Sequence, residues 1–366
     1  MTMFNINDPE DYNDGYYHIS KDVLDYPDAV VIFVWSRRGP GKTYGSLRYP
    51  YGKFKTIYLR RTVEDVVTIC TYDGDTELDP SPWVPLNRDF GLDVKAKLIN
   101  KKKAIGGFYN CTDGVPSGAV INYILPLNSI KFAKGMDFSD ADWVIFDEAI
   151  PQPGEIVKRD EGRMLLNFFE TVNRDRRKRG RPGLKLILMA NAEEISTPIT
   201  NTLDIIDDMA DMAAKRKHKV YLPDRKILLH HISNEECPRA DTDMDMEAVM
   251  KGTAWAEVSY EGGFGYNDFS CIKSMSIKGM RCMFHLHYNR LKDAYIYLNP
   301  KNGMYYMTHI KGQAVNDYDL DRENQQKKFH VEHAIKLRQA CIADHFYFEK
   351  YTYYDLIINF SKIYKI

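Results

Sequence analysis

A glycine-containing loop that ends in lysine and threonine gives the clearest sign of chemistry in this sequence. The loop Ser36–Thr43 has the sequence SRRGPGKT and directly follows the apolar run Ala29–Trp35. In a strand, loop and helix of this kind, backbone N–H groups and the helix N-terminus bind nucleotide phosphates. Lys42 would reach the β- and γ-phosphates of ATP, and the Thr43 hydroxyl would bind Mg²⁺. The expected ATP-binding residues are Ser36, Arg38, Gly39, Gly41, Lys42 and Thr43.

This loop departs from the G-x-x-x-x-G-K-[ST] pattern at one position, where Ser36 replaces the first glycine. Serine is small and is common in turns, so we expect the phosphate loop to be intact but slightly altered.

A second apolar strand, Asp142–Phe146, ends in the adjacent carboxylates Asp147 and Glu148. This pattern predicts Asp147 as a Mg²⁺ ligand and Glu148 as the base that orients and deprotonates the attacking water. A glutamate at this position is typical of motor ATPases of the additional-strand class, whereas a GTPase-like switch protein needs none. A third strand, Leu184–Ala190, ends at Asn191, which we expect to sense the γ-phosphate.

Two more apolar runs, Lys55–Leu59 and Gly118–Leu125, complete a set of strands separated by helical or loop segments. Runs of this kind predict a mostly parallel sheet with both faces covered. The phosphate site would lie at the carboxyl ends of these strands. The predicted fold class is therefore α/β, a P-loop NTPase of the additional-strand, catalytic-glutamate class.

Composition limits what else the chain can be. It has 366 residues, which at about 150 residues per domain indicates two domains. No apolar stretch approaches the roughly 20 residues needed to span a bilayer, and the acidic first 25 residues do not resemble a signal peptide. The six cysteines show no C-x-x-C spacing, which argues against a zinc site or a disulfide framework. We expect reduced thiols in a cytoplasm and a protein that is not secreted.

The net charge of −1 conceals three basic clusters, Lys101–Lys103, Arg174–Arg181 and Lys215–Lys219. Each alone is typical of a solvated surface, but three on one ATPase favour a non-specific grip on DNA phosphates. Lys101, Lys102 and Lys103 lie in a predicted hairpin that could project into a central pore. Arg174 follows a predicted amphipathic helix, Met164–Val172, and could reach a neighbouring subunit's γ-phosphate.

The second half predicts three strands, 280–288, 294–298 and 303–308, and then helices at 331–343 and 353–364. This order fits a smaller RNase H-like α+β domain, although an unrelated small α/β domain would fit too. A nuclease needs clustered carboxylates for two metal ions, and the first strand has none at its polar positions Arg281, His285 and His287. We therefore expect a vestigial domain without nuclease activity. His230, His231, His285 and His287 lack a partner at ligand spacing, so we predict packing or surface roles for them.

The predicted domains are an ATPase motor domain at 1–201, a helical linker at 202–238 with a short β element, and the nuclease-like domain at 239–366. The chain resembles the phi29-type DNA-packaging ATPases of small tailed phages with protein-primed genomes. The matching segments are Arg38–Tyr44, Ile57–Arg61, Val144–Glu148, Glu170–Arg176, Ala190–Ala192 and, in its aromatic and basic pattern, Tyr347–Ile366.

This resemblance implies that Arg174 is a trans-acting arginine finger and that Lys134 belongs to the coupling region. It also implies a homo-oligomeric ring, a pentamer, that acts on double-stranded DNA at the portal of a procapsid with ATP and Mg²⁺. The requirement for a scaffold RNA stays open. Two other functions also stay open, namely a helicase or other ring-forming DNA translocase, and a nucleotide-binding structural or signalling module.

Overall fold

The computed structural model describes residue 6 and residues 15–72, 78–133, 135–238, 248–289 and 292–366. The chain forms two compact units. The larger unit comprises Met1–Asp204 and Lys215–Tyr266, and the smaller unit comprises Ile205–Ala214 and Asn267–Ile366. Within the described ranges, no helix is both long and apolar enough to cross a membrane.

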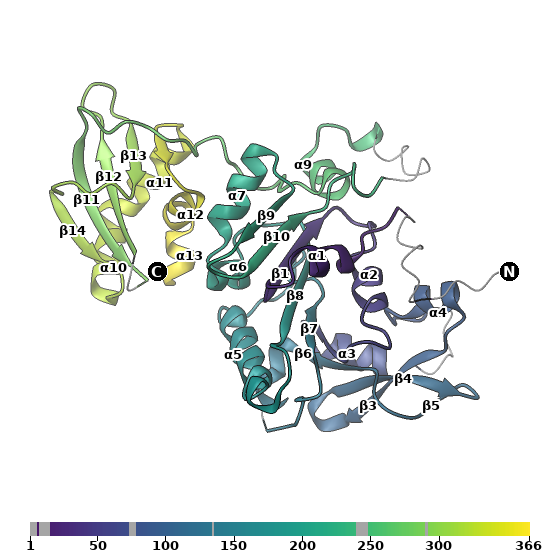
Figure 1. Ribbon diagram of the computed structural model, residues 1–366. Coiled ribbons are helices and arrows are strands. Elements are labelled where there is room, and N and C mark those ends of the chain that lie inside the picture. Colours follow the sequence, from purple (N-terminus) through teal and green to yellow (C-terminus); the bar gives the residue numbers. More distant parts are fainter. Residues whose placement is uncertain (1–5, 7–14, 73–77, 134, 239–247, 290–291) are drawn as a thin grey trace. The chain divides into compact units, whose positions relative to one another are not determined.

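A single ten-stranded sheet organises the larger unit (Figure 1). Its strands, in spatial order, are β3 (Val94–Asn100), β4 (Ile105–Thr112), β6 (Asn122–Pro126), β2 (Thr56–Arg60), β7 (Trp143–Phe146), β8 (Lys185–Asn191), β1 (Val31–Ser36), β10 (Ile227–His231) and β9 (Lys219–Leu222), with β5 (Val115–Pro116) paired to β4. The six central strands from β6 to β10 are parallel. The predicted mostly parallel sheet is confirmed.

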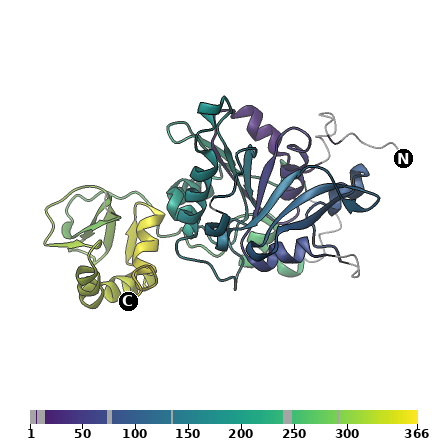
Figure 2. The ribbon, with the colours of Figure 1, turned by 90° about the horizontal axis from the view of Figure 1, so that it is seen from below.

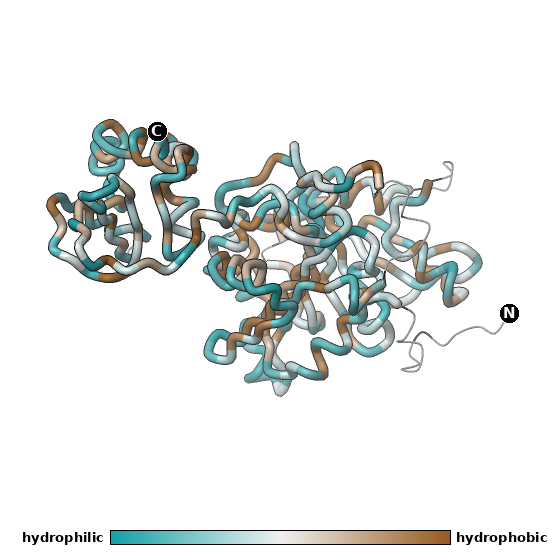
Figure 3. Tube along the Cα trace, turned by 90° about the horizontal axis from the view of Figure 1, so that it is seen from above, coloured by the Kyte–Doolittle hydropathy of each residue, from teal (hydrophilic) through white to brown (hydrophobic). Residues whose placement is uncertain are grey.

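The central strands are apolar along their whole length because both faces of the sheet are covered. Every residue of β1 and of β7 is buried. Alternate residues pack on opposite faces, so that Ile32 and Val34 join one core cluster with Ile145 and Ile187. Figure 3 shows hydrophobic segments running through the interior of this unit.

The position of β8 decides the geometry of the candidate site. This strand lies between β1 and β7, with Ser36 paired to Asn191 and Phe146 paired to Leu188. Because the three strands are parallel, their carboxyl ends meet at one edge of the sheet. The residues that follow β1, β7 and β8 are therefore neighbours in space, as the sequence pattern predicted.

The helical segments of this unit are α1 (Ile19–Asp25), α2 (Lys42–Arg48), α3 (Val63–Cys70), α4 (Val84–Phe90), α5 (Glu161–Asn173), α6 (Pro198–Leu203) and α9 (Ala254–Ala256), with short turns η2 (Lys101–Lys103), η3 (Leu127–Ala133), η4 (Arg177–Arg179) and η6 (Glu257–Glu261). Local sequence explains several boundaries. A capping box between Thr62 and Asp65 starts α3, and one between Thr197 and Thr200 starts α6.

The predicted hairpin of residues 95–109 is confirmed as β3 and β4, which pair antiparallel at the edge of the sheet. The turn between them is η2, which holds the three lysines Lys101–Lys103. Figure 2 shows these strands extending at the side of the unit.

The helix and the short β element predicted within 202–238 are both present, and the β element is part of the large sheet. Strand β10 pairs in parallel with β1, and β9 pairs with β10, so residues 219–231 belong to the large sheet. Helix α7 (Ile206–Lys215) instead belongs to the smaller unit, where Asp207 accepts hydrogen bonds of 2.9 Å from both the backbone N–H and the hydroxyl of Thr352. The partner of β10 in the sheet is almost 200 residues away in sequence, so no local pattern shows that this β element joins the large sheet.

The smaller unit is a five-stranded sheet with helices. The strand order is β14 (Asn316–Asp319), β11 (Arg281–Tyr288), β12 (Lys292–Leu298), β13 (Tyr305–Thr308) and β15 (Phe346–Phe348). Its remaining helical segments are α10 (Glu323–Phe329), η7 (His330–Ala334), α11 (Ile335–Ile342), α12 (Tyr351–Ile358) and α13 (Phe360–Tyr364). The three predicted strands and both predicted helical regions are confirmed. In β11, Phe284 and Leu286 alternate with the less buried His285 and His287, so the histidines lie on the opposite face from the core.

Candidate nucleotide-binding site

The loop between β1 and α2 has the backbone that a phosphate-binding loop requires. Gly39 and Gly41 have φ values of 93° and 88°, a left-handed conformation that favours glycine. Close packing adds a second requirement, because a Cβ on Gly45 in α2 would lie 2.2 Å from the carbonyl oxygen of Tyr17. The Tyr17 N–H in turn donates to the carbonyl of Pro40, with a distance of 2.8 Å. The segment before α1 thus supports the loop from outside.

Lys42 lies buried at the start of α2, and its ammonium is held by three oxygens. The Nζ atom lies 2.6 Å from the Ser36 hydroxyl, 3.0 Å from the Arg37 carbonyl and 3.1 Å from Asn191 Oδ1. Burial is the main cause that lowers the pKa of Lys42 to about 7, and the charges of Arg37 and Arg38 act in the same direction. The serine that replaces the expected glycine therefore has a defined role, since its hydroxyl accepts a hydrogen bond from Lys42.

Asp147, at the end of β7, lies beside the helix that starts at Lys42. Its Oδ2 accepts hydrogen bonds from the Thr43 hydroxyl at 2.9 Å and from the Tyr58 hydroxyl at 2.6 Å. Burial and the nearby Asp147 carboxylate hold the pKa of Tyr58 well above its ordinary value, so this phenol acts as a donor. A hydroxyl and a carboxylate placed together are ligands that Mg²⁺ prefers, and they fit the predicted metal position.

Glu148 follows in a left-handed conformation with a φ of 59°, and both of its carboxylate oxygens are held. Arg60 Nη2 lies 2.9 Å from Oε2, and Gln152 Nε2 donates to Oε1 at 3.0 Å. Arg60 also lies 3.7 Å from Asp147. The same arginine at the end of β2 therefore contacts both adjacent carboxylates.

These side chains surround a cleft of about 430 Å³ at the carboxyl edge of the sheet. That volume lies within the range of small-molecule sites. The lining residues are Arg38, Gly39, Pro40, Gly41, Lys42, Thr43, Tyr44, Ser81, Pro82, Pro85, Asp147, Glu148, Ala190 and Asn191. The cleft brings together the predicted loop residues, both carboxylates and Asn191. Ser36 does not line the cleft, but its hydroxyl accepts a hydrogen bond from Lys42, which does.

Sequence reasoning missed the roles of Arg37, Tyr58, Arg60 and Gln152. Arg37 is buried and donates to Asn234 Oδ1 at 2.8 Å and to the Cys237 carbonyl at 3.0 Å, which fixes the loop to the segment after β10. Arg60 stood out in the sequence only as part of a basic pair at a strand end. Its pairing with Glu148 depends on the order of strands, which no local pattern reveals.

Arg174 lies at the opposite edge of the sheet from the cleft of its own chain. It is exposed directly after α5, and nearby Arg176 bonds to the carbonyls of Ser139 and Ala141, which precede β7. Asp142, the residue before β7, is five residues from Asp147 along the strand, roughly 16 Å at about 3.3 Å per residue. Arg174 is not among the residues that line the cleft of the same chain.

Two of the basic clusters are not simply solvated surface. Arg176 is only 1% exposed and pairs with Asp142 at 2.8 Å, where it joins the end of α5 to the start of β7. Lys219 pairs with the fully buried Asp22 at 2.8 Å. Lys101 and Lys102 are exposed on their turn, as predicted, and Lys103 is half-buried. Lys134 lies outside the described residues.

The histidines of the two units divide into different environments. His231 stacks on Trp35 with ring centroids 5.6 Å apart, which confirms its predicted packing role. His230 is buried between Asp22 at 2.6 Å and Glu236 at 2.9 Å. His285 and His287 lie on the less buried face of β11, where β12 and β14 supply aspartate partners from other parts of the sequence.

The fold of the chain is similar to that of solved phage DNA-packaging motors. Two solved structures share the fold along nearly the whole chain. "The bacteriophage Phi-29 viral genome packaging motor assembly" matches with a TM-score of 0.62 and 18% identity, covering 95% of this chain and 99% of that chain. "The Phi-28 gp11 DNA packaging Motor" matches with a TM-score of 0.55 and 17% identity, covering 96% and 98%.

Sequence comparison then gives the family. The family described as podovirus DNA encapsidation protein (Gp16) matches residues 13–341, and the chain belongs to this family. Similar relatives are the DNA packaging protein of Bacillus phage B103, 24% identical over 290 residues (77% of this chain and 78% of the relative), and that of Bacillus phage phi29, 23% identical over 282 residues (75% and 73%). The resemblance found in the sequence motifs is confirmed.

Proposed function

We propose that this protein hydrolyses ATP in the cleft at the end of β1 and uses the energy to move double-stranded viral DNA through a portal into a procapsid. The observation that carries the proposal is the convergence of Lys42, Thr43, Asp147, Glu148 and Asn191 at one cleft in a chain of the DNA encapsidation family. The placement of β8 between β1 and β7 supports assignment to the additional-strand class of P-loop ATPases.

In this proposal the loop binds the phosphates of ATP through backbone N–H groups and the ammonium of Lys42. Thr43 and Asp147 would hold Mg²⁺, which neutralises charge on the phosphates. Glu148 accepts the proton of the attacking water, and Asn191 contacts the γ-phosphate while bonded to Lys42.

Arg60 would regulate the base. In the structure its guanidinium occupies one carboxylate oxygen of Glu148, while Gln152 occupies the other. Each oxygen of the carboxylate therefore already accepts a hydrogen bond, and these two contacts fix the orientation of the Glu148 side chain. We therefore propose that Glu148 becomes active only when Arg60 turns away, and that nucleotide or DNA binding produces this change.

Arg174 is proposed to act on the nucleotide of a neighbouring subunit in a homo-oligomeric ring, a pentamer by family resemblance. Its position beside the residues that precede β7, and its absence from the lining of its own cleft, support an action in trans. Its guanidinium would neutralise charge that develops on the γ-phosphoryl group in the transition state, which is worth roughly 10³ to 10⁵ in turnover.

We propose that the exposed lysines of the β3–β4 turn contact DNA phosphates. The other partners proposed for the protein are the portal and further copies of this chain. We place the protein in the host cytoplasm, transiently on the procapsid. The antiparallel β11, β12 and β13 followed by helices support an RNase H-like ancestry for the smaller unit. We propose that this unit has no nuclease activity.

Mixed rings test the proposal most directly. Glu148→Gln and Arg174→Ala should each be inactive alone, with turnover lowered about 10² to 10⁴-fold and 10³ to 10⁵-fold respectively. When both variants are combined, some sites have an intact Glu148 beside a neighbour's intact Arg174, and partial DNA-stimulated ATPase activity should return. Arg177→Ala, an exposed arginine in the same cluster, is the matched control and should keep activity.

No recovery in rings shown to be mixed would exclude action of Arg174 in trans. A helicase would instead separate strands and depend on single-stranded DNA. A structural or signalling module would bind ATP without turnover that responds to duplex DNA.

A further inference from the structure

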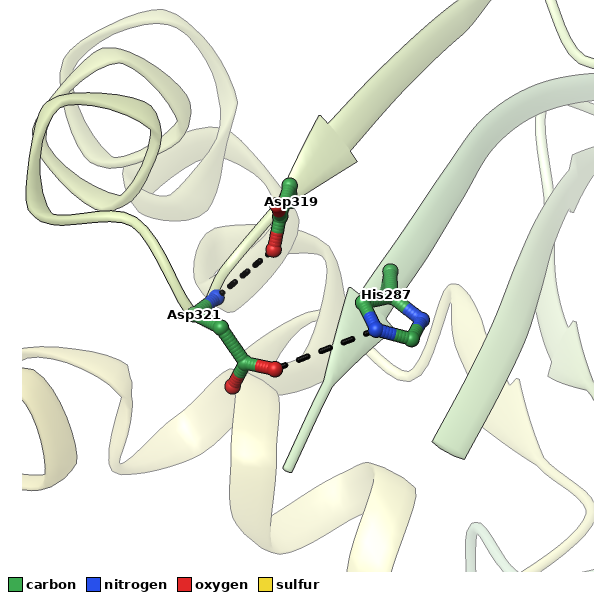
Figure 4. A group of neighbouring side chains, drawn as sticks. All are labelled: His287, Asp319 and Asp321. Atoms are coloured by element: carbon green, nitrogen blue, oxygen red, sulfur yellow. Dashed lines mark hydrogen bonds and ion pairs between the residues drawn. The ribbon is translucent and has the colours of Figure 1, made fainter. Parts of the chain in front are cut away.

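Three potential metal ligands meet at one edge of the smaller unit. His287 lies on β11, Asp319 ends the neighbouring β14, and Asp321 follows two residues later (Figure 4). The register of the sheet pairs His287 with Asp319 directly. One ligand atom from each residue lies within 4.8 Å of the other two. These three atoms could therefore contact a single ion after small side-chain movements.

The surrounding contacts leave this cluster accessible. His287 Nε2 lies 3.8 Å from Asp321 Oδ2, a separation too long for a good hydrogen bond. Asp319 pairs with Arg322 at 2.9 Å, but the Arg322 side chain is 73% exposed and can move away. The side chains of His287 and Asp321 are 37% and 34% exposed, so an ion could enter from solvent and keep bound water.

A fourth carboxylate orients His287 in the manner of a metal ligand. Asp293 Oδ1 on β12 lies 3.0 Å from His287 Nδ1, the ring nitrogen that faces away from Asp321. Histidine ligands almost always donate their second ring N–H to a carboxylate or carbonyl, which fixes the tautomer and aims the other nitrogen at the metal. With Nδ1 as the donor, the lone pair of Nε2 points toward the two aspartates.

His285, the other polar histidine of β11, differs in this respect. Its Nδ1 lies 2.7 Å from Asp317 and its Nε2 lies 2.9 Å from Asp293, so carboxylates occupy both ring nitrogens. His285 therefore positions Asp293 and is not itself a candidate ligand.

We propose that His287, Asp319 and Asp321 bind one divalent transition-metal ion, with Zn²⁺ or Mn²⁺ as the chemical class. An imidazole nitrogen with two carboxylates suits these ions better than Mg²⁺, which prefers oxygen ligands alone. Three protein ligands leave at least one coordination position for water. A single ion lacks the second metal of two-metal phosphodiester hydrolysis, so the site does not restore a nuclease. The site is separate from the ATP cleft and does not depend on the proposed ATPase function.

Metal binding to the full-length chain tests this proposal. The protein is stripped with a chelator and dialysed against Zn²⁺ without nucleotide, and bound zinc is counted by elemental analysis. The wild type should bind one ion more per chain than His287→Gln and than Asp321→Asn. The matched control is His309→Gln, because His309 pairs with one carboxylate, Glu349, at 2.7 Å in the same unit. This control should bind as many ions as the wild type. Any zinc that binds at Thr43 and Asp147 adds equally to the counts of all variants and does not change the differences between them.

Two further measurements distinguish a metal site from a simple ion pair between protonated His287 and the aspartates. Asp293→Asn keeps all three ligands but should weaken zinc binding about 10- to 100-fold, because the orienting carboxylate is lost. Co²⁺ in place of Zn²⁺ should give visible absorption bands that His287→Gln lacks. Circular dichroism confirms that each variant is folded. Equal ion counts and equal Co²⁺ spectra in the wild type and a folded His287→Gln variant would overturn the proposal.

Discussion

Binding of a nucleotide should make the protein take up a proton, because burial lowers the pKa of Lys42 and a bound phosphate should raise it again. Its pKa of about 7 means that at pH 8 only about 10% of the lysines are charged. A triphosphate next to Nζ should return the pKa toward 10.5, at which the lysine is almost fully charged. We therefore expect uptake of about 0.9 proton per bound nucleotide at pH 8 and of about 0.1 at pH 6.

The assay is calorimetric titration with a non-hydrolysable ATP analogue in buffers of different ionisation enthalpy. The slope of the observed enthalpy against the buffer enthalpy gives the number of protons taken up. Lys42→Arg is the control, because guanidinium stays charged at every pH used and should bind without this uptake. A slope near zero at pH 8, or an equal slope in Lys42→Arg, would refute the assignment of Lys42 as the titrating group.

Three further predictions concern stability, each measured by denaturant unfolding. Arg176→Leu should cost about 3 to 5 kcal/mol, because Asp142 loses its buried partner, and a loss below 1 kcal/mol would contradict that role. Gly45→Ala should destabilise the protein because its Cβ meets the Tyr17 carbonyl, whereas Gly183→Ala, with open space around it, should not. Burial opposes protonation of His230, but hydrogen bonds to two carboxylates raise its pKa overall. The free energy of unfolding of the wild type should therefore exceed that of His230→Gln by its largest amount below about pH 6.5. This difference should fall as the pH rises through the raised pKa of His230, and a difference that does not depend on pH would contradict the reasoning.

The elements of the candidate nucleotide-binding site were predictable because each motif is local. The apolar strands before Ser36, Asp147 and Asn191 have the composition of buried parallel strands, and the residues after such strands must share one edge of the sheet. The sequence therefore predicts both the strands and the side chains that converge on the cleft. Edge position, however, does not predict which side chains hold Glu148. Arg60 and Gln152 reach it only because of strand order and the loop after β7.

Sequence reasoning does not find contacts between segments that are distant in sequence. His287 has no carboxylate nearby along its own strand, yet Asp293 and Asp319 become its neighbours through pairing with β12 and β14. The basic run that contains Arg176 looks uniformly solvated, and only the folded structure distinguishes the buried arginine from exposed Arg174. Periodicity and composition are properties of one segment and contain no information on its partners.

The pairing of β1 with β10 has a consequence for the order in which the protein forms during synthesis. Val31 pairs with Ile227, so one neighbour of the phosphate-loop strand is made almost 200 residues later (Figure 1). At about 5 to 20 residues per second, that delay is roughly 10 to 40 s. Until then an apolar strand has an open edge, which is a template for aggregation. A nascent chain that stops near residue 201 would retain this open edge, because the strand that covers it has not been made.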